Sequence, residues 1–141
     1  MKHMFQIFDE FETADTKKQR MEIIGKNLSS TLVDVLKYTY HPAYQWFTTE
    51  MPENFEIAQD NIPGFNRSQL STELRRIYLF QKGHPDAEKL SPRKRQEVLY
   101  QLLDSVEPRE AEVILGIFRK DQGVKGLDYK FVKEAFPNLI P

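Results

Sequence analysis

The sequence predicts an all-α protein, a single compact domain of about seven helices over residues 1–141. Apolar side chains recur at spacings of three and four in most segments, which is the period of an amphipathic helix. Residues that cap helices precede several of these segments, and glycine or proline follows them. No segment alternates apolar and polar residues for more than a few positions, as a strand would. A chain of 141 residues has the usual length of one domain.

Three helices are expected before Pro42. The first has an apolar face made by Met4, Phe5, Phe8 and Phe11. The second is capped by Asp15 or Thr16, and its inward-facing side chains are Ile23, Ile24 and Leu28. Ser29 and Ser30 start a third helix, whose apolar stripe is Leu32, Val35, Leu36 and either Tyr38 or Thr39.

Less regular structure is expected over residues 44–65. Residues 44–50 are predicted to form one or two short turns that carry Tyr44, Trp46 and Phe47. Pro52, Pro63 and Gly64 all oppose helix formation. We therefore expect an irregular loop from residue 51 to residue 65.

A fourth helix follows, for which Asn66 is the predicted cap and Gln69 stands in capping-box position. Its buried stripe is predicted to be Leu70, Leu74, Ile77 and Tyr78. Gly83 closes the helix, and residues 82–90 form a polar connection.

Three more helices complete the chain. Ser91 and Pro92 give a hydroxyl cap followed by proline at the first helical position, and the apolar face is Val98, Leu99, Leu102, Leu103 and Val106. Glu107 and Pro108 begin the next helix, which buries Val113, Ile114, Ile117 and Phe118. Gly123 and Gly126 bracket a tight turn. Asp128 then caps a last short helix over Phe131, Val132, Ala135 and Phe136.

The composition offers little catalytic chemistry. The absence of cysteine rules out disulfides, iron–sulfur clusters and thiolate zinc sites. His3, His41 and His84 are scattered, so we expect surface or capping histidines and no metal site. There is no phosphate-binding glycine loop and no nucleophile elbow, and Glu107 and Glu110 fit a helix start. These features predict a protein that is not an enzyme and has no cofactor.

No segment has the length and apolarity of a membrane span or a signal peptide, so a cytoplasmic protein with no membrane partner is expected. The net charge is −1, but it is unevenly distributed. Residues 1–60 carry six basic side chains against ten acidic ones, whereas residues 61–141 carry fourteen against eleven. The stretch from Arg75 to Arg95 holds seven basic residues against two acids. Such charge runs are either solvated helix faces or a local positive face for phosphate.

Two blocks of the sequence resemble the N-terminal DNA-binding domain of phage ATP-dependent DNA ligases. The C-terminal block comprises Ile117-Phe118-Arg119-Lys120-Asp121, Gly123-Val124, Lys130, Lys133, Ala135-Phe136-Pro137 and Asn138-Leu139-Ile140-Pro141. The N-terminal block comprises Thr16-Lys17-Lys18-Gln19, Ile23-Ile24, Lys26-Asn27, residues 35–40, Tyr44-Gln45-Trp46-Phe47 and Met51-Pro52. The two blocks occur in the order that the ligase domain has, and residues between them match only in helical pattern.

The resemblance implies a helical domain that grips duplex DNA through the phosphate backbone, in a stand-alone phage protein. In the ligases a catalytic domain with a Lys-x-Asp-Gly lysine follows, whereas Lys125-Gly126-Leu127-Asp128 has another order, so no ligation chemistry is expected. The predicted DNA-binding residues are Lys17, Lys18, Arg119, Lys120, Gly123, Lys125, Gly126 and Lys130. A glycine-bounded turn before a helix exposes backbone N–H groups to phosphate, although the same glycine can simply close a helix beside solvated lysines.

A second hypothesis keeps the fold and changes the partner. The acidic first half of the chain would repel a duplex, and this favours an accessory or inhibitor that binds a replication, transcription or host protein. Tyr38, Tyr40, Tyr44, Trp46 and Phe47 either stack on bases or a partner, or belong to the core, as this spacing more often indicates. A continuous positive face joining residues 75–95 to residues 119–133 would favour DNA, and alternating charges would favour a protein.

Overall fold

The computed structural model describes residues 3–47 and 68–141, and these ranges form a compact all-α domain. The first three helices are α1 (Met4–Glu12), α2 (Lys17–Lys26) and α3 (Ser30–Tyr40). After the gap come α4 (Leu70–Glu73), the 3-10 helix η1 (Leu74–Phe80), α5 (Pro85–Glu88), α6 (Pro92–Ser105), α7 (Pro108–Arg119) and α8 (Tyr129–Ala135). The described residues thus hold eight α-helices, one more than the sequence predicted, and no strand.

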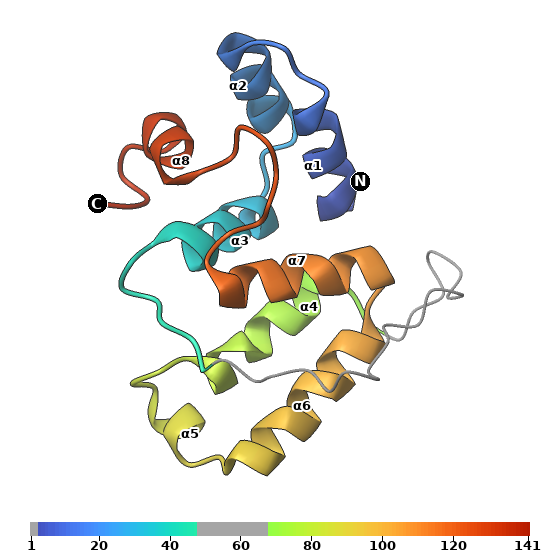
Figure 1. Cartoon of the computed structure of the whole chain (residues 1–141), viewed down its shortest axis with the longest axis vertical. Coiled ribbons are helices and arrows are strands. Elements are labelled where there is room, and N and C mark those ends of the chain that lie inside the picture. Colours follow the sequence, from blue (N-terminus) through green and yellow to red (C-terminus); the bar gives the residue numbers. More distant parts are fainter. Residues whose placement is uncertain (1–2, 48–67) are drawn as a thin grey trace.

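Helix α7 is the centre of the arrangement. It packs against α1, α3 and α6, and α3 also contacts α8. Figure 1 shows α7 crossing the middle of the molecule, with α1, α2 and α8 on one side of it and α4, α5 and α6 on the other. Elements from the two ends of the chain therefore pack together, which lets each helix bury its single apolar stripe.

Local sequence signals explain most helix starts. The Thr16 side chain accepts a hydrogen bond from the Gln19 amide at the start of α2, and Ser29 accepts one from Leu32 in α3. Ser91 and Asp128 cap α6 and α8 in the same way. These four caps confirm the predicted starts of the helices.

The predicted core is confirmed for α6 and for most positions of the other helices, and it is corrected at Leu28, Phe5 and Phe118, of which Phe118 is half-buried. Val98, Leu99, Leu102, Leu103 and Val106 are all buried. Leu28, which was predicted to face inward, is 58% exposed because α2 ends at Lys26 and Leu28 lies beyond the helix. Phe5 is only half-buried, and Ile7 takes its place in the core.

The segment from Leu74 to Phe80 departs from the prediction for a physical reason. It is a 3-10 helix, in which residues three apart lie above one another. Leu74, Ile77 and Phe80 are therefore the buried set, and Tyr78, which an α-helical period would have buried, is 37% exposed. The cap predicted at Asn66 lies outside the described residues, and the described helix starts at Leu70.

Two connections also differ from the prediction. Residues 44–47 form no helical turn, and Trp46 pairs with Gln81 in an isolated antiparallel bridge. Residues 82–90 contain α5, whose start repeats the cap-then-proline pattern of α6 with His84 and Pro85. The predicted loop over residues 51–65 lies outside the described residues.

Candidate functional site

The turn between α7 and α8 has the shape that the two glycines predicted. Gly123 and Gly126 adopt φ values of 68° and 85°, where glycine avoids the strain that a Cβ would bring. The Leu127 amide donates to the Val124 carbonyl over 3.0 Å and closes the turn. A Cβ at Gly126 would also lie 2.8 Å from Nε of Arg20, so only glycine fits here without moving that side chain.

The backbone donors of this turn already have acceptors. The Gly123 amide donates to Oδ1 of Asp121 over 2.9 Å, and the Lys125 amide lies 3.4 Å from Oε1 of Glu12. At the start of α8, the Phe131 amide donates to Oδ1 of Asp128 over 2.8 Å. Three carboxylates thus occupy the positions at which the sequence predicted that backbone N–H groups would be accessible to phosphate. Each of them would repel an anion.

Lys120 points into the protein. It ends α7 in the left-handed region with φ 61°, and its Nζ donates to the carbonyls of Tyr38 over 3.2 Å and His41 over 2.6 Å. A lysine amine at the end of α3 satisfies carbonyls that have no partner inside the helix. Burial lowers the pKa of Lys120 to about 8, because the charged form loses water. Lys120 therefore helps to hold α3 against α7.

Gln122 is a polar centre that the sequence analysis missed. Its Nε2 donates to Oγ1 of Thr39 and to the carbonyl of Val113, both over 3.0 Å. Its backbone amide lies 3.4 Å from the hydroxyl of Tyr40, which donates to the Leu127 carbonyl over 3.2 Å. Burial raises the pKa of Tyr40 to about 12. An amide side chain between two helices has no local sequence signature, since its partners lie far away along the chain.

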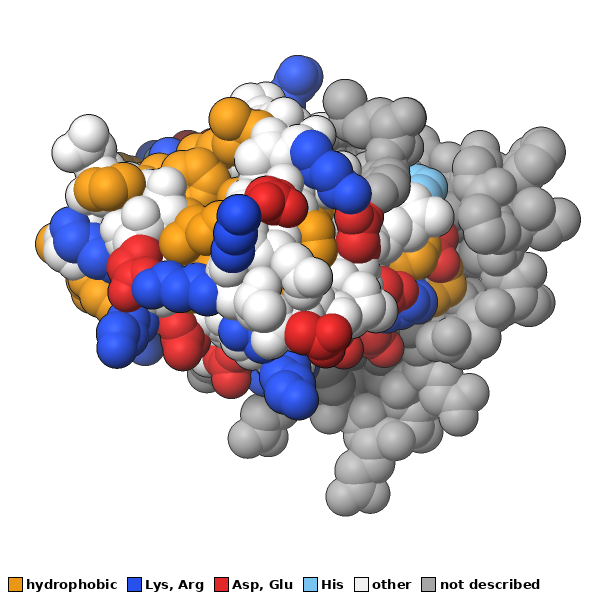
Figure 2. All heavy atoms as spheres, turned by 90° about the horizontal axis from the view of Figure 1, so that it is seen from above, with side chains coloured by type: hydrophobic (Ala, Val, Ile, Leu, Met, Phe, Trp, Pro, Cys, Tyr) orange, Lys and Arg blue, Asp and Glu red, His pale blue; other side chains and the backbone are white. Residues whose placement is uncertain are grey.

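The other basic residues predicted as DNA contacts lie at the surface. Lys17 forms an ion pair with Glu134 of α8, which brings α2 and α8 together. Lys18, Arg119, Lys125 and Lys130 are exposed. Figure 2 looks onto the end of the molecule where α2 and α8 lie, and basic and acidic side chains alternate across it with apolar ones between them. This face has no single sign of charge.

The basic stretch from Arg75 to Arg95 does not extend this face. Helix α6 starts at the opposite end of the molecule from α8 (Figure 1). Arg95 is only 8% exposed, and it donates to the carbonyls of Ala87 and Leu90 beneath the ring of Phe47. Arg93 pairs with Glu97 on the same helix.

The aromatic residues are mainly structural. Trp46 is buried and packs edge-on against Phe118, with ring centroids 5.8 Å apart. Tyr38 and Tyr44 are half-buried, and the ammonium group of Lys37 lies 5.1 Å and 5.8 Å from the centroids of their rings. This placement agrees with the interpretation of the cluster as core, with one edge at the surface.

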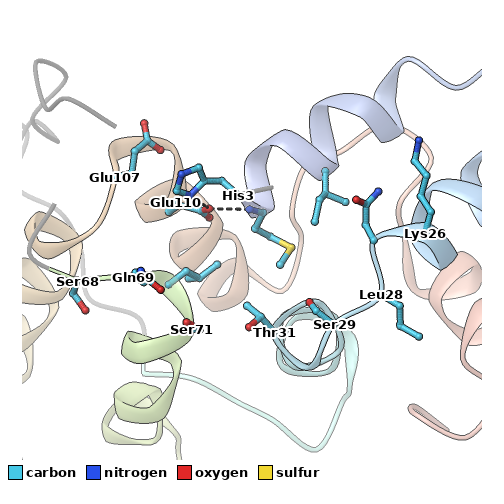
Figure 3. Close-up of a pocket in the computed structure, with 14 residues that line it drawn as sticks. His3, Lys26, Leu28, Ser29, Thr31, Ser68, Gln69, Ser71, Glu107 and Glu110 are labelled. Carbon is cyan, nitrogen blue, oxygen red and sulfur yellow. Dashed lines mark hydrogen bonds and ion pairs between the residues drawn. The ribbon is translucent and has the colours of Figure 1, made fainter. Parts of the chain in front are cut away.

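A cavity of about 540 Å³ opens between α1, the α2–α3 connection, the start of α4 and the start of α7. Figure 3 shows Glu110 at one end of it, next to His3, with Gln69 and Ser71 on one side and Ser29 and Thr31 on another. Glu107 caps α7, as its position predicted, by accepting a hydrogen bond from the Arg109 amide over 3.0 Å. Glu110 does more than favour the helix start, because its carboxylate links α7 to the Met4 amide of α1 over 2.8 Å.

The histidines occupy the capping and surface positions that the sequence predicted. His84 caps α5 by accepting a hydrogen bond from the Asp86 amide, and Nδ1 of His41 accepts one from Ala43. His3 lies 3.2 Å from Glu110. Within residues 3–47 and 68–141, no group of three or more His, Cys, Asp or Glu side chains is placed to hold a metal ion.

Comparison with protein families gives one match. The model of a family of unknown function (DUF6433) matches residues 7–125, which run from within α1 through α7 and into the turn before α8. The chain belongs to this family. Its description names no activity, so the resemblance to the ligase domain stays a prediction.

Among curated proteins, none matches the chain. In the part of this DUF6433 member that the structure describes, no helix is both long and apolar enough to cross a membrane.

Proposed function

We propose that this protein is a non-catalytic interaction module that binds another protein through the face formed by α2, α8 and the turn at residues 120–127. The observation that carries the proposal is the alternation of charge on this face (Figure 2). Acidic and basic groups lie next to one another there. The carboxylates of Asp121 and Glu12 face amides of the turn, and Lys17 pairs with Glu134.

Alternating charges suit a protein surface better than a duplex. A phosphate backbone presents one sign of charge at close spacing, so each carboxylate on the binding face costs affinity. A protein partner can place opposite charges against each group and thereby gain specificity. Tyr129, at the start of α8, is 41% exposed and supplies an aromatic side chain of the kind that anchors protein interfaces.

The partner class follows from the sequence resemblance. A domain with a ligase-like fold in a phage would meet replication, transcription or host proteins inside the infected cell. The proposed role is therefore that of an accessory or an inhibitor in the host cytoplasm, with no cofactor and no chemistry of its own.

This proposal is tested by placing a photo-crosslinking amino acid at residue 129 and irradiating cells that naturally produce the protein. We expect one protein adduct of defined mass that survives nuclease treatment. The same crosslinker at Gln101, an exposed position on α6, is the matched control and should give no such adduct. Equal adducts from both positions, or none from residue 129, would refute a partner at this face.

Duplex DNA is the second candidate, because several exposed basic side chains lie around the same turn. Lys18, Lys125 and Lys130 are exposed, and no ion pair engages them among the described residues. Arg119 is exposed at the end of α7. Side chains of this kind can contact phosphates without any base recognition.

Duplex binding at about 50 mM salt decides between the candidates, since a nonspecific binder is strongest at low salt. If DNA is the ligand, Lys125→Ala and Lys130→Ala should each weaken binding to any duplex by a similar factor. Each should also reduce the slope of log affinity against log salt by about 0.9. Arg93→Ala, at the other end of the molecule, is the control. The absence of duplex binding by the unmodified protein would eliminate the DNA candidate.

A further inference from the structure

The carboxylate of Glu110 is buried, and only one of its two oxygens has a hydrogen-bond partner among the described residues. The residue is 3% exposed. Its Oε1 accepts the Met4 amide over 2.8 Å and lies 3.2 Å from Nδ1 of His3. Its Oε2 has no hydrogen-bond partner among residues 3–47 and 68–141. A buried carboxylate oxygen left in this state costs free energy, so proteins rarely keep one without a use for it.

The unpartnered oxygen belongs to a group that lines the cavity between α1, α3, α4 and α7 (Figure 3). A volume of about 540 Å³ lies within the range of small-ligand sites. Met4, Ile7 and Leu70 are the buried apolar side chains of the lining. Hydroxyl and amide groups contribute the polar part: Asn27, Ser29, Thr31, Ser68, Gln69 and Ser71.

The charges around the cavity favour a cation. Glu107 and Glu110 both line it. Of the two basic residues in the described part of the lining, Lys26 forms an ion pair with Glu10, and His3 shares the oxygen of Glu110 that is already occupied. Burial and the neighbouring Glu107 raise the pKa of Glu110, whereas a bound cation would lower it. An anionic ligand would be repelled by these two carboxylates.

We propose that this cavity binds an organic cation, an alkylammonium or guanidinium group that donates hydrogen bonds to the carboxylate of Glu110. The methylene chain of the ligand would lie against Met4, Ile7 and Leu70, and hydroxyls of the lining would accept its remaining N–H groups. The cation is supplied either by a free amine or by a lysine or arginine side chain of another protein. The site does not depend on the partner face of α2 and α8.

The proposal is tested by adding n-butylammonium or Nα-acetyl-lysine amide to the full chain and following backbone NMR shifts. Such small ligands bind weakly, so the titration runs to about 50 mM at constant ionic strength. We expect saturable shifts at lining residues with both amines and none with butyrate or n-butanol. Tighter binding of the lysine amide identifies a protein side chain as the source, and equal binding identifies a free amine.

Two variants of equal charge change provide the decisive comparison. Glu110→Gln replaces the accepting oxygen by an amide and should weaken amine binding about tenfold or more. Glu112→Gln lies two residues along α7, is exposed, and does not line the cavity, so it should bind like the unmodified protein. Equal weakening in both variants, or no shifts with either amine, would overturn the proposal.

The unmodified protein gives a test that needs no variant. Carbon-13 NMR reports the pKa of the Glu110 carboxyl directly. Amine binding should lower it, because the cation stabilises the charged form. Affinity should correspondingly rise with pH through that pKa, with His3, Glu107 and Lys26 as the other titratable groups that line the cavity. An unchanged pKa at saturating amine would rule out contact with Glu110.

Discussion

Replacing Lys120 by alanine removes both hydrogen bonds by which its amine holds the end of α3, at 3.2 Å and 2.6 Å. A hydrogen bond of this kind contributes about 0.5–1.5 kcal/mol to folding. We expect Lys120→Ala to lower the free energy of unfolding by about 1–2 kcal/mol. This lies in the lower part of the range for two such hydrogen bonds, because the side chain is only half-buried. An ordinary exposed lysine changes stability by under about 0.5 kcal/mol, and Lys125→Ala is the matched control.

The left-handed backbone at residue 120 adds an internal check. With φ 61°, every side chain pays a steric cost there that glycine escapes. Lys120→Gly loses the same hydrogen bonds but recovers about 1 kcal/mol of strain. The expected order of stability is therefore lysine, then glycine, then alanine. Urea denaturation followed by circular dichroism measures all three. A glycine variant less stable than the alanine variant, or an alanine variant equal to Lys125→Ala, would refute this account of Lys120.

The pH dependence of the stability difference between wild type and Lys120→Ala tests the environment of the Lys120 amine. Burial lowers the pKa of Lys120 from 10.5 to about 8 in the folded protein, so between these pH values the unfolded chain binds more protons. Stability then rises with pH across this window. The free-energy difference between wild type and Lys120→Ala should grow from pH 8 to pH 10.5, and it should stay constant below pH 8. A difference that shrinks over the window would mean that the charged form is the one the fold favours.

Three further substitutions probe other contacts. Asp128→Ala removes the cap of α8 and should cost about 1 kcal/mol in urea denaturation; a loss near zero would mean that α8 contributes no stability. Tyr40→Phe removes the hydroxyl that donates to the Leu127 carbonyl and should lower stability by about 1 kcal/mol, which an unchanged midpoint would contradict. The Arg109 guanidinium lowers the pKa of Asp9, so the advantage of wild type over Asp9→Asn should be fully present at pH 6 and decline as pH falls from about 4 through the lowered pKa. An advantage that does not decline on acidification below pH 4 would assign it to packing.

The parts of the fold that follow local rules were predictable, and the failures have local causes too. The cap at Ser91 and the cap at Asp128 were both identified, because a cap acts within three residues of itself. Tyr78 was wrongly assigned to the buried stripe, and Phe80 was left out of it, because the segment winds with three residues per turn and an α-helical period was applied to it. The start of α5 carried a usable signal in His84 and Pro85 that the sequence analysis did not recognise.

The candidate sites were harder to predict because their contacts are long-range. Glu110 looked like a residue that only favours a helix start, yet its partner is Met4, more than one hundred positions away. Lys120 looked like a surface cation, but its acceptors are on α3. Composition and spacing fix neither pairing, because both depend on how α1, α3 and α7 pack. The glycines of the turn were predicted correctly, since glycine is the residue that adopts positive φ without steric strain.

The contacts of the 120–127 segment limit what the face around it can bind. Lys120, Gln122 and Tyr40 tie this segment to α3 at several points, and its amides at residues 123, 125 and 127 are matched to acceptors within the protein. A phosphate would have to break these bonds before it gained any backbone donor, and it would face the displaced carboxylates. The exposed groups of this face are instead side chains such as Lys18 and Tyr129, the latter with its hydroxyl donating to the Pro141 carbonyl. A rigid surface that offers side chains of both charges and an aromatic ring discriminates by shape and pairing, which favours a folded protein as its partner.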